Sequence, residues 1–269
     1  MKFSLLLIGL LFTISAPAQE PAFDGRIELR APVRSNWVIT FKPSKAMRVA
    51  ESGKSRSASI EELPMTPDAT DRVLTSVKVE KSNELYAEFS TFSDGTKSQK
   101  WSIGAIQFRE IKDGSVLAMA SMNLLDPDFS DHSKHDFEEL EWLTKEFYKG
   151  VINYQNQACF LFQTTTDKRP PTRRDKALQR FLADPETERL KAGQGSPPEA
   201  AAKAPSTPVL VIISAVTRLP LVYNDGQILR TYSYKTSGLE PLVPPDKFAR
   251  EFAAWRKHAA ELDRAPAAP

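Results

Sequence analysis

Two histidines separated by two residues, His132 and His135, lie in a segment that is rich in aspartate, and Asp131 directly precedes the first of them. A bent His-x-x-His loop can bring two imidazoles to one ion with a carboxylate as third ligand, a set that Zn²⁺ accepts. These residues define a candidate metal site and the hypothesis of a secreted metal-dependent hydrolase. We favour the alternative of a solvated loop, because zinc enzymes usually carry such a pair on a helix with a glutamate between, and none stands here.

Two other segments contain residue types that could do chemistry. Gly53-Lys54-Ser55 resembles the end of a phosphate-binding loop, but Arg48 occupies the position of the upstream glycine. Cys159, the single cysteine, stands inside the apolar run Ala158–Phe162, which favours a small buried side chain over a nucleophile. The sequence contains no Gly-x-Ser-x-Gly motif, so we expect a non-enzymatic protein without a cofactor.

The net charge limits the kinds of partner that the protein can attract. The formal net charge of the 269 residues is +2, with acidic and basic residues interspersed, so no overall field attracts nucleic acid. One basic cluster could contact anionic lipid headgroups or an acidic cell-wall polymer, but we favour the alternative of a solvated helix face. No aromatic residue interrupts this cluster, which argues against single-stranded nucleic acid as a partner. The cluster consists of Lys168, Arg169, Arg173, Arg174, Lys176 and Arg180.

Large aromatic side chains supply the remaining candidates. In predicted strands and in the last predicted helix they could line an apolar cavity, and the alternative is ordinary core packing. The candidate ligand-binding residues are Trp37, Phe41, Phe89, Trp101, Phe248, Phe252 and Trp255.

Mostly antiparallel strands must position these residues. Apolar and polar residues alternate with the period of two that strands require. Asp-Gly pairs between β-prone runs favour hairpin turns, and therefore antiparallel pairing. The predicted strands include Arg26–Arg30, Trp37–Lys42, Val73–Val79, Leu85–Phe89, Lys100–Ile103, Val151–Thr166, Val209–Ile213 and Ile228–Tyr234. The predicted turns are Asp94-Gly95, Asp113-Gly114 and Asp225-Gly226.

Loops and helices complete the expected layout. Residues 43–71 lack a period and predict a long polar loop, whereas Asp136–Leu143 predicts a short helix that ends by Gly150. Residues 167–208, with a charged helix over Arg173–Ala183, are expected to form an insertion between two strands. A last amphipathic helix opens at Pro245-Asp246.

The N-terminus predicts export. Lys2, the apolar run Phe3–Ile14 and Ala16-Pro17-Ala18 have the order of a secretory signal peptide over residues 1–18. The apolar run is shorter than the roughly twenty residues that a membrane-spanning helix needs, so we expect a protein that does not span the membrane after cleavage. Residues 19–269 are expected to form one β-rich domain in the periplasm or outside the cell.

The stretch Val211–Val222, with its Thr217-Arg218-Leu219-Pro220 turn, and the following hairpin through Asp225-Gly226 to Tyr232 resemble the C-terminal part of the LolA-like family. That family comprises periplasmic lipoprotein carriers and their relatives. The resemblance implies an α+β fold that is mostly antiparallel β: a curved sheet, or half-barrel, with a few helices packed on or in its concave face.

Three functions follow from these observations. A curved sheet with one apolar face can form a cavity for a lipid or another hydrophobic ligand, and this is the function that we expect. The first alternative is the metal-dependent hydrolase. The second is a structural or protein-binding module that contacts an envelope protein through its strand edges.

Overall fold

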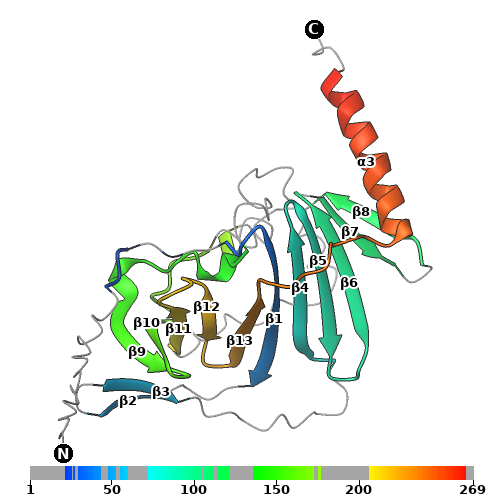
Figure 1. Cartoon of the computed structure of the whole chain (residues 1–269). Coiled ribbons are helices and arrows are strands. Elements are labelled where there is room, and N and C mark those ends of the chain that lie inside the picture. Colours follow the sequence, from blue (N-terminus) through cyan, green and yellow to red (C-terminus); the bar gives the residue numbers. More distant parts are fainter. Residues whose placement is uncertain are drawn as a thin grey trace, which may run out of the picture.

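The computed structural model describes residues 22–25, 27, 30–43, 48–52, 55–59, 72–104, 106–111, 114–120, 136–172, 175–176 and 206–264. The predicted signal peptide, the predicted metal ligands and most of the predicted insertion lie outside these ranges. Among the described residues, thirteen strands form one sheet and one long helix, α3 (Asp246–Arg264), follows the last strand (Figure 1). The expected class, mostly antiparallel β with a curved open sheet, is confirmed.

The strand order is β2-β3-β9-β10-β11-β12-β13-β1-β4-β5-β6-β7-β8, and all neighbours are antiparallel except β3 and β9. The first eight strands are β1 (Arg34–Pro43), β2 (Arg48–Ser52), β3 (Ser55–Ser59), β4 (Leu74–Ser82), β5 (Leu85–Phe92), β6 (Lys97–Ile103), β7 (Ile106–Glu110) and β8 (Val116–Ala120). The others are β9 (Tyr148–Tyr154), β10 (Gln157–Thr165), β11 (Pro208–Ser214), β12 (Pro220–Asn224) and β13 (Ile228–Lys235).

Central strand β1 defines two faces of the sheet, because successive side chains of a strand point in opposite directions. Trp37, Ile39 and Phe41 lie on one face, which we call the Trp37 face. Val38 and its alternate neighbours lie on the other, the Val38 face. The register extends both faces across the sheet, since Ile39 stands opposite Val77 of β4 and Tyr232 of β13.

The segment 136–147 covers part of the Trp37 face. It contains two 3₁₀ turns, η1 (Glu138–Leu140) and η2 (Lys145–Phe147), so the short helix predicted over Asp136–Leu143 is a single 3₁₀ turn and not an α-helix. The reason is visible in its spacing: Phe137, Leu140 and Leu143 recur every three residues, which is the period of a 3₁₀ helix. All three are buried in the largest core cluster, and each later amide donates to the carbonyl three residues earlier.

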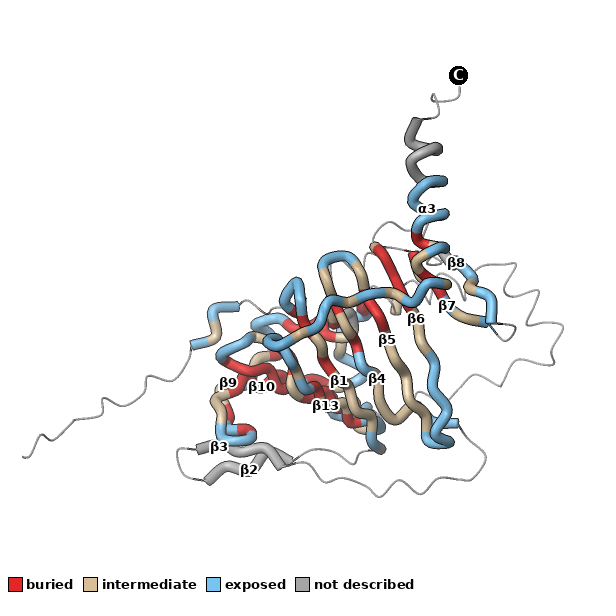
Figure 2. Tube along the Cα trace, turned by 45° about the vertical axis from the view of Figure 1, so that its right-hand side comes forward, coloured by how far each residue is buried: buried red, intermediate tan, exposed pale blue. Residues whose placement is uncertain are grey.

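Helix α3 packs on the Val38 face at the other end of the sheet. Phe248 and Phe252 contact Trp101, with ring centroids 5.8 and 6.5 Å away, and Phe252 lies 4.4 Å from Phe108. The helix begins where the sequence predicts it, after Pro245. Its later turns project beyond the sheet in Figure 1, and residues 256–258 are exposed (Figure 2).

Three sequence predictions need correction. The segment predicted as a polar loop over residues 43–71 contains the hairpin β2–β3, whose short polar strands pair through backbone bonds and carry no apolar alternation. The single strand predicted over Val151–Thr166 is the hairpin β9–β10, because Gln155 and Asn156 turn the chain at φ of 50° and 61° without any glycine signal. In the predicted strand Arg26–Arg30, the described Ile27 and Arg30 lie outside any strand.

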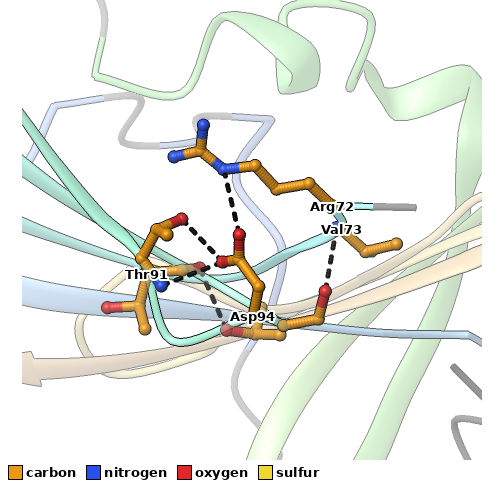
Figure 3. Close-up of polar contacts among 7 residues, drawn as sticks. Arg72, Val73, Thr91 and Asp94 are labelled. Atoms are coloured by element: carbon orange, nitrogen blue, oxygen red, sulfur yellow. Dashed lines mark hydrogen bonds and ion pairs between the residues drawn. The ribbon is translucent and has the colours of Figure 1, made fainter. Parts of the chain in front are cut away.

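The predicted turn at Asp94-Gly95 joins β5 to β6 (Figure 3). Gly95 has φ of 77°, a value that glycine adopts without strain. The Asp94 carboxylate accepts hydrogen bonds from the Thr96 amide at 2.9 Å and from its hydroxyl at 2.6 Å. Arg72 Nε lies 3.9 Å from the same carboxylate, so the turn is held by side chains as well as by backbone.

Candidate functional site

A hollow of about 610 Å³ opens on the Trp37 face, beside the edge of the covering segment. Its floor comes from neighbouring strands β1 and β4. Ile39 and Phe41 of β1 and Leu74 and Val77 of β4 line it, and all four are only partly buried. Among the described residues, the hollow therefore leaves part of an apolar sheet surface uncovered.

Charged side chains surround this floor in pairs. They come from strands, from η1 and from the turn after β10, and each cation lies near one carboxylate. The pairs are Lys81–Asp136 at 2.7 Å, Lys100–Glu88 at 2.8 Å, Arg169–Asp175 at 2.9 Å and Arg230–Glu139 at 3.4 Å. These pairs, together with the Asp225 carboxylate, make the rim of the hollow polar.

The Lys81–Asp136 pair anchors the covering segment to the sheet. Its side chains are 7% and 1% exposed, and the Asp136 carboxylate also accepts the Ala31 amide at 2.6 Å. Lys81 donates in turn to the Ala31 carbonyl at 3.1 Å. One buried ion pair thus ties β4, the segment before β1 and the start of the cover together, and so fixes one wall of the hollow.

Glu139 of η1 forms a second link between cover and sheet. Its Oε1 accepts the Tyr232 hydroxyl at 2.7 Å and lies 3.4 Å from Arg230 Nη1. Burial raises the pKa of Tyr232 well above its ordinary value, and the Glu139 charge raises it further. Burial works to lower the pKa of Arg230, but the Glu139 charge and other negative groups outweigh it and the pKa is raised. Tyr232 is therefore a fixed donor and Arg230 a fixed cation.

The structure divides the predicted ligand-binding residues between two places. Trp37 and Phe41 line the hollow. The other five gather around the foot of α3: Trp101, Phe248 and Phe252 are buried in its core cluster, and Phe89 and Trp255 pack against that cluster. The candidate set of seven is thus not one cavity lining.

The predicted metal ligands Asp131, His132 and His135 lie outside the described residues. Within the described ranges, no three His, Cys, Asp or Glu side chains gather as a metal site would require. Cys159 lies on the Val38 face, where burial raises the pKa of its thiol to about 11. At neutral pH that thiol is protonated, so it lacks the thiolate that a nucleophile needs.

Sequence reasoning missed the polar residues of the hollow. Arg230 lines the hollow and alternates along β13 with Tyr232 and Tyr234, so the sequence contains the signal that these three share one face. The pairing of β13 with β1 places that face on the side of Trp37. Glu139 carries no such signal. It reaches the hollow only because the covering segment folds back over the sheet.

Comparison with known proteins supplies no assignment: no family model matches the chain, and neither does any curated protein. None of the described helices is long and apolar enough to cross a membrane.

Proposed function

We propose that this protein is an exported envelope protein that binds the apolar part of an amphiphile, such as the acyl chain of a lipid, and does not catalyse a reaction. In this proposal the sheet is a LolA-like half-barrel and the hollow lies in its concave face. The observation that carries the proposal is the partly buried apolar floor of the hollow beside a paired, polar rim. The signal-peptide pattern and the resemblance of the C-terminal hairpin support it.

The size of the hollow agrees with this ligand class. Small-molecule sites typically enclose about 300–1,000 Å³, and the hollow has about 610 Å³. Burying about ten methylene groups gains roughly 8 kcal/mol, of which association entropy removes a large part. We therefore expect dissociation constants well above about 1 μM, up to the millimolar range, for a single medium-length chain.

Two neighbouring residues of β1 provide a matched test. Ile39→Trp places a large side chain in the hollow, whereas Val38→Trp places the same side chain on the opposite face. Calorimetric titration with dodecanol, a neutral acyl probe, is expected to show binding to the wild type and to Val38→Trp, and at least tenfold weaker binding to Ile39→Trp. Equal binding by both variants, or no binding by the wild type, contradicts the proposal.

A further inference from the structure

Arg230 is the most weakly paired cation around the hollow. The other three cations lie 2.7–2.9 Å from their carboxylates, whereas Arg230 Nη1 lies 3.4 Å from Glu139. That separation exceeds the range of a good N–H to oxygen hydrogen bond. The ion pair of Arg230 therefore remains electrostatic, without the directed hydrogen bonds that a guanidinium normally forms with a carboxylate.

Within the described part of the chain, the hydrogen-bonding capacity of Arg230 is largely unused. A guanidinium has five N–H donors, and its carboxylate neighbour Glu139 already accepts the Tyr232 hydroxyl at 2.7 Å. Arg230 Nε is buried without a hydrogen-bond partner among the described residues. Asp225, also at the hollow, accepts the amides of Gln227 and Ile228 in its own turn.

The surroundings hold the guanidinium in place at the hollow. Its Cζ lies 5.0 Å from the ring centre of Tyr223 and 5.7 Å from that of Phe41, so aromatic rings flank it. The side chain is 26% exposed and lines the hollow, next to the apolar floor. A partly desolvated cation with free donors beside an apolar surface is complementary to an acidic head joined to an apolar tail.

We propose that Arg230 binds the oxyanion of an acidic amphiphile, a carboxylate or a phosphate, while the acyl chain lies on Ile39 and Val77. This inference rests on the proposed function and specifies its ligand: a negatively charged lipid is preferred to a neutral one. Glu139 competes with the ligand for the same guanidinium. Removing the Glu139 charge should therefore strengthen the preference, and removing Arg230 should abolish it.

The test compares dodecanoate with dodecanol, which share a chain and differ in head charge, by calorimetric titration of the full chain. The wild type is expected to bind dodecanoate about tenfold more tightly, which is the size of one hydrogen bond to a charged group. Arg230→Met should reduce that ratio to about one, and Glu139→Gln should raise it. Arg72→Met, which removes a cation that pairs with Asp94 outside the hollow, is the matched control and should leave the ratio unchanged.

Dodecanol binding is measured in each variant as a control, because it shows that the hollow is still folded. Dodecanol binding without a preference for dodecanoate, or a preference that survives Arg230→Met, overturns the role of Arg230 and leaves the proposed function standing. Absence of binding by both probes overturns the two together. Inorganic phosphate is expected to give no measurable heat, and phosphate binding as tight as that of dodecanoate would show a site for free oxyanions and overturn the amphiphile assignment.

Discussion

Both faces of the sheet carry large apolar side chains, but these side chains are buried to different extents on the two faces. On the Val38 face, α3 brings Phe248 and Phe252 over Trp101, and all three are at most 5% exposed. On the Trp37 face, the described part of the cover places Phe137 against Trp37, whereas Ile39 and Phe41 are only partly buried. An apolar sheet face thus becomes a core where its cover is complete and a candidate binding site where the cover ends.

The largest test of this difference is a pair of identical substitutions. Phe248→Ala should lower the free energy of unfolding by about 4 kcal/mol, because it leaves a cavity in a closed core. Phe41→Ala should cost only about 1 kcal/mol, since that ring is partly exposed in the hollow. Urea denaturation measures both, and equal losses would mean that the hollow is packed like the core beneath α3.

A second test removes the anchor of the incomplete cover. Lys81→Met leaves the Asp136 carboxylate buried without its cation and should cost about 3 kcal/mol at neutral pH. Adding Asp136→Asn removes the uncompensated charge while keeping an acceptor for the Ala31 amide, so it should restore part of that loss. If the double variant is no more stable than Lys81→Met in urea denaturation, the ion pair is not what holds the cover.

A smaller effect is expected from the second link between cover and sheet. Tyr232→Phe removes the hydroxyl that donates to Glu139 and should cost about 2 kcal/mol, because that bond is to a charged acceptor. Tyr234→Phe, on the same face, removes a bond to the neutral Pro220 carbonyl and should cost about 1 kcal/mol. The reverse order in denaturation experiments would contradict the role assigned to Glu139.

The smallest effect concerns the turn at Asp94, which lies outside the three core clusters. Hydrogen bonds from Thr96 hold the pKa of this carboxyl below its ordinary value. A depressed folded pKa stabilises the protein above the unfolded pKa of about 3.9, and this contribution disappears as pH falls through the folded pKa. Asp94→Asn should therefore be less stable than the wild type at pH 7, with the difference shrinking toward pH 2 in urea denaturation. A difference independent of pH would contradict this account.

Much of the sheet could be predicted because alternation and turn residues are local signals. Asp94-Gly95 and the alternation in β1 predicted their elements correctly. The β9–β10 turn was missed because Gln155 and Asn156 adopt positive φ without a glycine. The short helix over Asp136–Leu143 was predicted, but its 3₁₀ form and its packing on the sheet were not, because its acidic first turn resembles an α-helix start and its contacts are with a remote sheet.

The candidate site was less predictable than the fold. Trp37 and Trp101 are both buried aromatic residues on strands, yet only Trp37 borders the hollow, because α3 covers Trp101. The local sequence does not show on which part of the sheet α3 packs, so the two tryptophans could not be distinguished. Arg230 and Glu139 come from segments about ninety residues apart. The hydrogen bond beside them, from Tyr232 to Glu139, joins residues 93 positions apart in the chain, and only the tertiary fold brings them together. The types of side chain were enough to select candidate residues. Which of these candidates line the hollow depends on how far the covering segment and α3 extend over the sheet.

Mass spectrometry of small molecules that co-purify with the full chain from its native host tests the central claim most directly. The account predicts an acyl-chain amphiphile, enriched in acidic head groups, that is lost from Ile39→Trp and retained by Val38→Trp. Recovery of no acyl-bearing molecule, or equal recovery from both variants, would contradict it.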